Sequence, residues 1–441
     1  MTATSHTPTA TALLSTLLKH AVIDAKGQSI GEIGDAIITL RGHDYPLVTG
    51  LVAKVGSATL FVPMSRVVAI DADRVELRSA KLDLRPFARR DGEVLLRADV
   101  LGHRLIDVDR ALLVRAHDVQ LTQTDDGWIA SGLDVHKRPW LHIGPRHERH
   151  PLRDWRSFEA LIGHGPSVLV RSPFGKLRRL KPAQIADLIE EASREEQEEL
   201  LAQVHSDPEL EADVFEELDE DQQSQLLRSR SSEQVAEVLA RMRADDAADA
   251  LMDLPQERRL PVLDLMPDPQ RSKVRTLLGY NTATAGGLMG VDYLAAPQHS
   301  TIDQVLDTLR KATTQQPEAL TTIYSLDSDG RLTGAIGLVQ ALQLDPNTAL
   351  RDAVDSDPVR VAPEDDLVEV TRRMADYNLL TLPVVDDSDH ILGVITVDDA
   401  LEAAIPDDWQ RREPRHHAAG GTYPADPPTT SDQADAPLPP P

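Results

Sequence analysis

The stretch Thr284-Ala285-Gly286-Gly287-Leu288-Met289 separates two sequence patterns that together decide the fold. Before it, from Pro182 to Leu278, apolar residues recur at helical spacing, as Val235, Val238 and Leu239 do. After it, short apolar runs typical of strands alternate with helical segments. The sequence therefore predicts an all-α domain followed by an α/β region.

The α/β region contains an internal repeat. Its second copy has a helix from Val368 to Tyr377, a strand that begins at Leu382, and a second strand that leads into Asp398 and Asp399. The first copy has the same order roughly 60–70 residues earlier, and such repetition is stronger evidence than a single match. Its helix is expected at residues 305–310 and its strands at 322–327 and 332–336.

The all-α segment also repeats, with a unit of apolar helix, acidic turn and apolar helix about every 24 residues. Three such units contain Val214, Val238 and Val262, respectively. Each unit can bury its apolar face only against its neighbours, so the pattern predicts helical hairpins stacked in a superhelix.

Each α/β copy resembles a CBS (cystathionine-β-synthase type) domain. Together with the acidic helical segment and the Gly286-Gly287 junction, the order over residues 183–408 resembles the cytosolic part of an MgtE-type magnesium channel. The resemblance implies an MgtE-N-like domain at 183–285 and CBS domains at 286–345 and 346–408. It also implies a homodimer formed through the CBS domains.

The N-terminal half changes to short β-type runs separated by Gly and Asp turns, which suggest a small barrel. The opening from Asp24 resembles a PRC-barrel, named after the photosynthetic reaction centre. We expect one such domain at residues 11–80, a weaker second one at 92–165 and a linker at 166–182. These barrels commonly serve as docking modules, so a membrane transporter or another protein is the expected partner of this half.

The chain ends are polar or Pro-rich, and we expect a disordered leader at residues 1–10 and a disordered tail at 409–441. No stretch approaches the roughly 18 apolar residues of a membrane helix, and no signal-peptide core is present. These features predict a cytoplasmic protein without its own pore. The absence of cysteine excludes disulfides and thiolate catalysis, and no nucleophile–base pair stands out, so we expect no enzyme activity.

The charge is divided unevenly between the two halves. The 441 residues contain 46 Lys and Arg against 72 Asp and Glu, but residues 1–182 contain 26 against 20 and the remainder 20 against 52. Such an acidic half repels nucleic acid and attracts cations. On charge alone, the simpler explanation that acidic surfaces aid solubility is favoured.

Asp245 and Asp249 stand at i and i+4 in the acidic helical segment, where like charges repel and a hydrated Mg²⁺ would relieve the repulsion. Spacing alone favours an ordinary acidic helix start. The resemblance reverses that preference, because this helix matches the one that the family uses for magnesium sensing. Asp399, Glu402 and Asp407 also match acidic positions that bind Mg²⁺ in the family.

Two further family positions differ. Asn378 and Val368 stand where the family has acidic residues, so metal affinity is in question. The resemblance also implies an adenine-nucleotide site, for ATP or a relative, in which a Ser/Thr-x-x-Asp element provides a hydroxyl for phosphate and a carboxylate for ribose. Thr396 and Asp399 match this element, whereas the first copy has Gly337 in place of Thr396, so one such site is expected.

The segment from residue 136 to 150 contains His136, His142, His147 and His150 among Arg and Pro. A metal site is conceivable, but a basic, exposed connector is favoured because the spacing fits no helical ligand pair and prolines interrupt it. Trp140 within this segment, and Trp155 and Phe158 further along, are expected to anchor it to a neighbouring barrel.

The sequence as a whole predicts a non-catalytic, cytosolic, Mg²⁺-sensing regulatory protein. The first alternative is an adenine-nucleotide-sensing CBS adaptor in which Mg²⁺ is incidental. The second is an RNA-associated docking factor that uses the basic barrel half, although its aromatic residues are too sparse to make nucleic acid the first choice.

Overall fold

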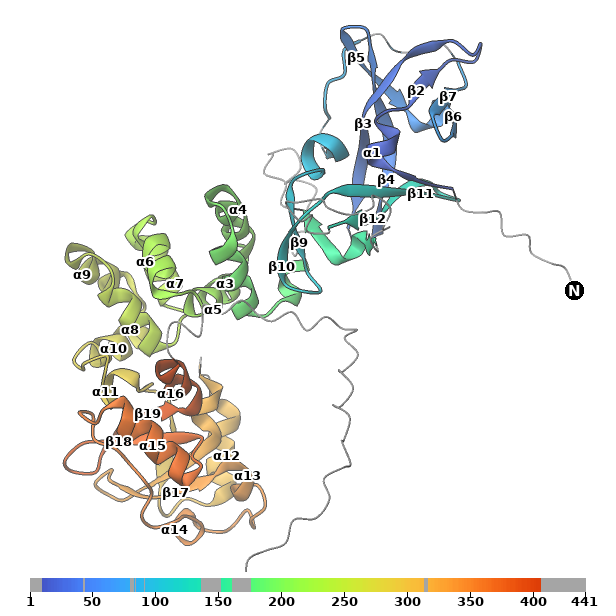
Figure 1. The fold of residues 1–441 in the computed structure, drawn as a ribbon. Helices are drawn as coiled ribbons and strands as arrows, with labels where there is room; N and C mark the ends of the chain where they lie inside the picture. The colour runs from blue at the N-terminus through green and yellow to red at the C-terminus, as the bar shows by residue number, and fades with distance from the viewer. Residues whose placement is uncertain are drawn as a thin grey trace, which may run out of the picture.

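The computed structural model describes residues 10–42, 44–79, 83, 85–90, 92–135, 152–160, 176–312 and 316–405. Along the chain, a β-rich half is followed by a row of helices and then by an α/β pair (Figure 1). The predicted multidomain class is therefore confirmed for these parts. The predicted tail and, apart from Ala10, the predicted leader lie outside the described residues.

The N-terminal half is built on one curled sheet that forms a half-barrel. Its long strands β3 and β4 pair antiparallel at its centre. The strands β11 and β12 join the same sheet through Ile129 of β12, which lies opposite Leu47 of β4, and β1 pairs with β11 at the edge. Strands from both predicted barrel segments therefore pair with each other, and the likeness to a PRC-barrel stays a prediction. The strands of this sheet are β1 (Thr11–Leu13), β2 (Ala21–Ile23), β3 (Ser29–Arg41), β4 (Asp44–Val55), β5 (Ala58–Pro63), β6 (Val67–Ile70), β7 (Arg74–Leu77), β8 (Glu93–Leu95), β11 (Asp118–Thr124), β12 (Gly127–Asp134) and β13 (Arg153–Asp154).

A small second sheet connects this half to the helices. It contains β9 (Arg104–Asp107), β10 (Leu112–Arg115) and β14 (Phe158–Ala160). Trp155 and Phe158 are buried in the core of the half-barrel, which confirms the anchoring role predicted for these two residues, whereas Trp140 lies outside the described residues. On the helical side, Ile106 belongs to the helical core, and the guanidinium of Arg104 lies 3.1 Å from a carboxylate oxygen of Glu196.

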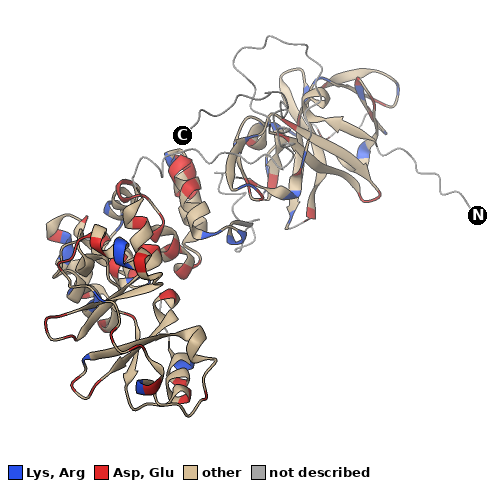
Figure 2. Ribbon diagram, turned by 60° about the horizontal axis from the view of Figure 1, so that its bottom comes forward, with Lys and Arg blue, Asp and Glu red and all other residues tan. Residues whose placement is uncertain are grey.

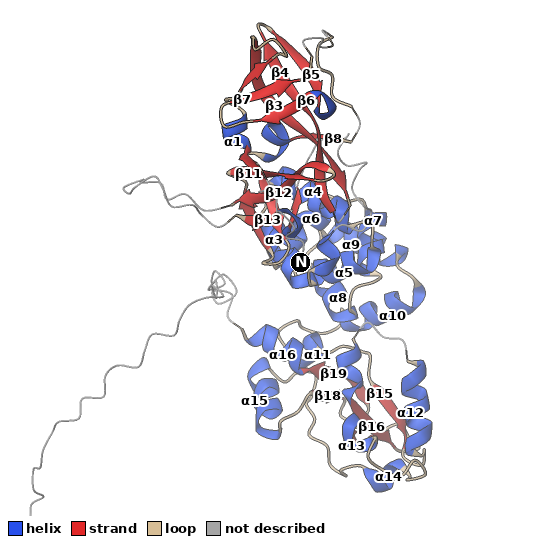
Figure 3. Ribbon diagram, turned by 90° about the vertical axis from the view of Figure 1, so that its right-hand side faces the viewer, coloured by secondary structure: helices blue, strands red, loops and turns tan. Residues whose placement is uncertain are grey.

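The helical domain is a stack of hairpins, as predicted. The first helices of successive hairpins pack on one another, and the second helices of the later hairpins do the same, so that each hairpin buries its apolar face against its neighbours. Figure 3 shows this row of helices between the sheets and the α/β pair. The helices are α3 (Pro182–Glu191), α4 (Arg194–Val204), α5 (Pro208–Glu216), α6 (Glu220–Arg228), α7 (Ser232–Leu239), α8 (Ala244–Met252), α9 (Gln256–Leu265) and α10 (Asp268–Leu277).

The two α/β copies have the same strand topology. In the first copy, β15 runs parallel to β16, which pairs antiparallel with β17. In the second copy, Val361 makes a parallel bridge to Val384 of β18, which pairs antiparallel with β19. The elements are α11 (Ala285–Leu288), β15 (Leu294–Pro297), α12 (Ile302–Lys311), β16 (Thr322–Leu326), β17 (Leu332–Gly337), α13 (Leu338–Ala341), α14 (Leu350–Ala353), α15 (Leu367–Tyr377), β18 (Thr381–Val385), β19 (Ile391–Thr396) and α16 (Val397–Ala404).

A strand of each copy also forms backbone hydrogen bonds with the segment that precedes the other copy. Gly290 exchanges two hydrogen bonds with Val394 of β19, both 2.9 Å long. Ala335 of β17 exchanges two with Asp355, at 3.2 and 3.0 Å. The copies are therefore tied together through their backbones as one unit.

The glycine pair of the junction permits a close approach of backbones. The N–H of Gly286 donates to the carbonyl of Pro363 at 2.9 Å, which joins the junction to the second copy. A Cβ on Gly287 would lie 2.3 Å from the carbonyl oxygen of Asn281 and 2.4 Å from Cα of Thr282. Since both neighbours are backbone atoms, no side-chain movement relieves that overlap.

We predict that Gly287→Ala destabilises the α/β pair and its junction. Overpacking of this kind costs about 1–3 kcal/mol, and we expect a lower midpoint of thermal unfolding. The control is Gly337→Ala, whose added Cβ meets no atom within 4 Å and which has no positive φ. Equal midpoints for the two variants would contradict the steric explanation.

Candidate functional site at the helical and CBS interface

The candidate site lies where the N-terminus of α8 meets the N-terminus of α16. Figures 1 and 3 both place α16 beneath the helical row, with α11 near it. Arg243 directly precedes α8, and Thr396 directly precedes α16. Figure 2 shows Asp and Glu concentrated on the helices in the middle of the molecule. Two helix starts rich in carboxylates therefore face each other.

Arg243 provides the positive charge between these helix starts. Its Nε donates to Oδ2 of Asp246 at 2.7 Å and lies 3.5 Å from Oε2 of Glu216. Its Nη1 donates to Oδ1 of Asp399 at 3.1 Å, and its backbone N–H donates to Glu216. The side chain is 17% exposed. A single guanidinium therefore joins three carboxylates from α5, α8 and α16.

Asp399 accepts hydrogen bonds from three parts of the chain. Its Oδ1 accepts from Arg243 of the helical domain, and its Oδ2 accepts from Nε2 of Gln316 in the first copy at 2.9 Å. The hydroxyl of Thr396, in its own copy, donates to the same Oδ2 at 2.7 Å. Gln316 is 3% exposed and Asp399 11% in its side chain, so this junction is largely shielded from water.

The carboxylates at the interface outnumber the cation. Burial raises the pKa of Glu216 to about 7 and that of Asp246 to about 8, although Arg243 lowers both. Burial also raises the pKa of Asp399, Glu402 and, most strongly, Asp245. Each of these groups favours a proton or a further cation beside it.

Asp245 and Asp249 have different surroundings, although they are four residues apart on α8. Asp245 is buried, faces the charges of Asp246 and Asp399, and its Oδ1 has no hydrogen-bond partner. Asp249 is exposed, and its charged neighbours are Asp253 and Glu220. Desolvation and these two carboxylates raise the pKa of Asp249 to about 6. The structure thus brings Asp245 to the interface and leaves Asp249 outside it.

The other predicted ligands have varied outcomes. Glu402 lies one turn after Asp399 on α16 and interacts with the charges of Arg243 and Glu217. Asp407 and the four histidines between residues 136 and 150 lie outside the described residues. Within the described part of the chain, no three His, Asp or Glu side chains are grouped so that they could hold a metal ion.

Of the two departures from the family pattern, Asn378 has a local structural role. Asn378 ends α15 with a φ of 53°, in the left-handed region that Asn tolerates better than most residues. Val368 is 71% exposed on the same helix. Neither residue contributes an acidic ligand, and Asn378 instead terminates the helix.

The predicted nucleotide element forms a helix cap. Thr396 and Asp399 make reciprocal side-chain to backbone hydrogen bonds, a capping box at the start of α16. Gly337 occupies the corresponding place in the first copy, at the end of β17, and provides no side-chain cap to α13. Thr396 and Asp399 therefore lie at the predicted strand end, but they bond to each other there.

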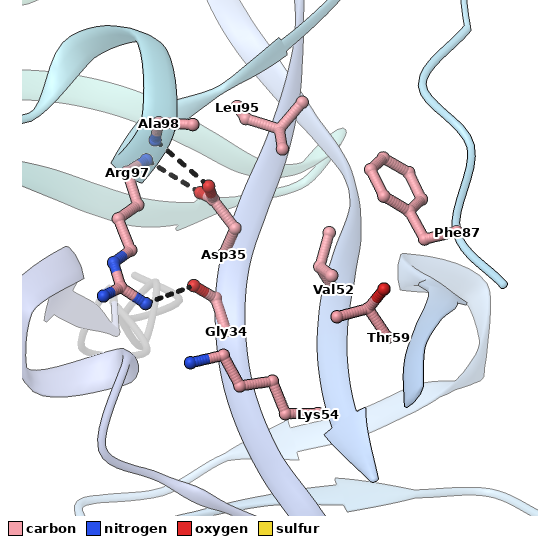
Figure 4. Close-up of a pocket in the computed structure, with 9 residues that line it drawn as sticks. All are labelled: Gly34, Asp35, Val52, Lys54, Thr59, Phe87, Leu95, Arg97 and Ala98. Atoms are coloured by element: carbon pink, nitrogen blue, oxygen red, sulfur yellow. Dashed lines mark hydrogen bonds between the residues drawn. The ribbon is translucent and has the colours of Figure 1, made fainter. Parts of the chain in front are cut away.

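The N-terminal half contains a hollow of about 380 Å³ beside β3, β4 and the short helical turn Leu96–Val100 (Figure 4). Lys54 and Arg97 line one side and Phe87 the other. Its carboxylate, Asp35, accepts hydrogen bonds from the backbone N–H groups of Arg97 and Ala98 at 2.7 and 3.1 Å. Asp35 therefore fixes the helical turn to β3 rather than serving as a ligand.

The matches to known protein families lie in the helical row and in the α/β pair. Residues 180–283 match the MgtE intracellular N domain, and residues 350–405 match the CBS domain. The magnesium transporter MgtE of Thermus thermophilus is 37% identical over 163 residues, which are 36% of this chain and 36% of that protein. Over this part of its length, the chain is similar to MgtE.

Other relatives show the same partial coverage. MgtE of Bacillus subtilis is 24% identical over 193 residues, 44% of this chain and 43% of that protein, so the chain spans less than half of these relatives. The crystal structure of the cytosolic domain of the Mg²⁺ channel MgtE in complex with ATP is 31% identical, covers 51% of this chain and 91% of that chain, and has a TM-score of 0.47. The soluble part of a magnesium transporter is 24% identical, covers 54% and 91%, and also has a TM-score of 0.47. Among the described residues, we find no helix whose length and hydrophobicity would let it cross a bilayer.

Sequence reasoning missed three residues of this interface. Arg243 stands directly before Asp245 and Asp246, so a search for a cation beside an acidic pair could have found it. Glu216 could have been found as an acidic residue at the end of a helix of the MgtE N domain. Gln316 carries no comparable signal, because it reaches Asp399 from 83 residues away.

The raised pKa values predict that the interface becomes more stable as pH falls from 8 towards 5. Glu216 and Asp246 have folded pKa values of about 7 and 8 against ordinary values of 4.5 and 3.8, so the folded chain binds more protons in this range. The free energy of unfolding therefore rises as the pH falls through the folded pKa values. It reaches its full gain below the ordinary pKa values. We expect slower hydrogen exchange of α8 amides at pH 5.5 than at pH 8, after correction for intrinsic exchange.

Asp246→Asn serves as the control, since it mimics the protonated carboxyl and should reduce the pH dependence. Asp83 and Asp154, with pKa values lowered to about 2, lose their interactions only at more acidic pH. Protection that increases with pH between 5.5 and 8 would contradict this explanation.

Proposed function

We propose that this chain is a non-catalytic regulatory protein that senses Mg²⁺ at the interface between its MgtE N domain and its second CBS domain. The observation that carries the proposal is the unpartnered, buried Oδ1 of Asp245 among carboxylates that share one guanidinium. Homology to proteins named magnesium transporters supports the choice of ion.

The chemistry of the donors fits a divalent cation with oxygen ligands. Mg²⁺ keeps most of its water molecules in proteins and is commonly held by one or two carboxylates. Asp245 and Asp399 would hold such a hydrated ion, Glu402 one turn further would reach it only through its water molecules, and the two charges of the ion would reduce the repulsion in the cluster. Asp407 remains a proposed ligand, whereas Asp249 would act only if its exposed side chain met another acidic surface.

The proposal predicts that Mg²⁺ binds the full chain and raises its thermal midpoint. Asp245→Asn should weaken the affinity about tenfold or more and reduce the rise of the midpoint. An ion that binds only the folded chain stabilises it by mass action. Isothermal titration calorimetry gives the affinity, and a thermal melt in EDTA and in millimolar Mg²⁺ gives the stabilisation.

The matched control is Asp264→Asn, which removes an exposed carboxylate from α9 of the same domain. Asp249→Asn tests the second residue of the predicted pair and should have the smaller effect. The absence of Mg²⁺ binding up to tens of millimolar would overturn the proposal.

The nucleotide alternative is favoured by one observation, the position of Thr396 and Asp399 at the end of β19. Titration with ATP in the same calorimeter separates the two functions. ATP binding that is lost in Thr396→Ala but kept in Asp245→Asn would favour a nucleotide-sensing adaptor in which Mg²⁺ is incidental.

We further propose that the chain forms a homodimer through α15 and α16 of the second CBS domain. These helices pack together and expose several large apolar side chains, among them Val368 at 71% and Leu401 at 56%. Such a surface favours burial against a partner. Tyr377, Leu380 and Ile405, at or near the ends of these helices, are also exposed. The occupant that we propose for this surface is a second copy of the chain.

The double change Val368→Glu and Leu401→Glu should therefore shift the mass in solution from dimer to monomer, measured by sedimentation equilibrium. Leu260→Glu is the control, since Leu260 is 69% exposed on α9 of the helical domain. A dimer that persists in the double variant would contradict this interface.

A further inference from the structure

We infer that Arg243 is an internal cation that holds the helical domain on the CBS pair without a metal ion. The inference concerns the site of the proposed function and assigns it a metal-free closed state. It also implies that a ligand of Asp399 competes with Arg243. The evidence is the set of contacts that this one side chain makes across the interface.

Arg243 joins segments that are far apart in the chain. Its Nη1 reaches Asp399, 156 residues later, at 3.1 Å, while Nε remains bonded to Asp246 of its own domain at 2.7 Å. Glu216 fixes the arginine from α5 through its backbone N–H and its Nε. The arginine is therefore held from the helical side and presents Nη1 to the CBS side.

The chemistry of arginine suits this task. A guanidinium stays charged throughout the physiological range, and its planar fork fixes several carboxylates in one geometry. At 17% exposure, its interactions are only weakly screened by solvent. A divalent ion would bring charge to the same carboxylates, but Arg243 already provides it from within the chain.

The bonds of Asp399 explain why ligands must compete. Oδ1 accepts from Arg243, and Oδ2 accepts from Gln316 and Thr396, so both oxygens already have donors. Gln316 and Thr396 belong to the CBS pair, whereas Arg243 belongs to the helical domain. A cation or ribose hydroxyl that takes Oδ1 therefore displaces the bond that joins the two domains.

The absence of cysteine from the sequence permits a direct test of this closed state. Cysteines introduced at the exposed positions Glu257 on α9 and Asp303 on α12 carry spin labels, and double electron–electron resonance measures the distance between the helical domain and the CBS pair. We expect the otherwise unchanged chain to give one narrow distance distribution in EDTA. Arg243→Gln should broaden that distribution and shift it to longer distances.

The matched control is Arg241→Gln, because Arg241 forms ion pairs with Glu209 and Glu237 of the helical domain. It should leave the distance unchanged. Arg243→Lys retains the charge without the planar fork and should give an intermediate distribution, and it also guards against a misfolded Gln variant. Circular dichroism checks that each variant is folded.

Several outcomes decide the inference separately from the proposed function. An unchanged distance in folded Arg243→Gln in EDTA, or an open distribution in the chain with Arg243 intact, would overturn the internal cation even if calorimetry shows Mg²⁺ binding. Opening of Arg243→Gln that Mg²⁺ reverses would support both proposals. Opening that Mg²⁺ leaves unchanged would support the role of Arg243 and count against Mg²⁺ sensing.

Discussion

The contact between Arg243 and Asp399 joins the helical domain to the CBS pair, and the closed state that we infer for the C-terminal half depends on it. Taking two charges out of water is costly, and their attraction compensates only when the geometry is good and the remaining donors and acceptors are satisfied. Here Glu216 and Asp246 satisfy the arginine, while Gln316 and Thr396 satisfy the aspartate. The pair is thus supported from both domains, and loss of either partner would leave a poorly solvated charge.

The same cluster has an excess of negative charge, because several carboxylates surround one permanent cation. Asp245 lies in this field with an unpartnered oxygen, and its pKa is raised mainly by burial. An interface with surplus negative charge responds to protons and cations, since either one removes repulsion that packing alone cannot relieve. A fully neutralised interface would hold the domains together without such sensitivity.

Much of the fold could be predicted from the sequence because the signals were local and repeated. The helical period, the repeat in the MgtE N domain and the strand pattern around Leu382 all correspond to elements in the structure. The Gly286-Gly287 junction also marked the boundary between the helical and the α/β regions. Glycine is required there because backbones approach closely at Gly287. Pairing between strands of the two predicted barrel segments was not foreseen, because contacts such as that of Ile129 with Leu47 join positions far apart in sequence.

The site was harder to predict than the fold, because residue spacing does not determine burial. Asp245 and Asp249 share a helical spacing, yet one is buried at the interface and the other is exposed. Whether a side chain on α8 meets the CBS pair depends on how that pair docks, which no local pattern of α8 records. The contribution of Gln316 depends in the same way on the packing of the first copy against the second.

The two CBS copies share their topology but differ at the start of the helix that follows the last strand. This difference places the proposed Mg²⁺ response in the second copy. Thr396 caps α16 and bonds Asp399, whereas Gly337 leaves α13 without a side-chain cap. The first copy nevertheless contributes Gln316 to Asp399, and the hydroxyl of Tyr324 in β16 lies 2.8 Å from that of Thr381 in β18. Backbone pairs at Gly290 and Asp355 also tie the copies together. Asp399 is therefore bonded to both CBS copies and, through Arg243, to the helical domain.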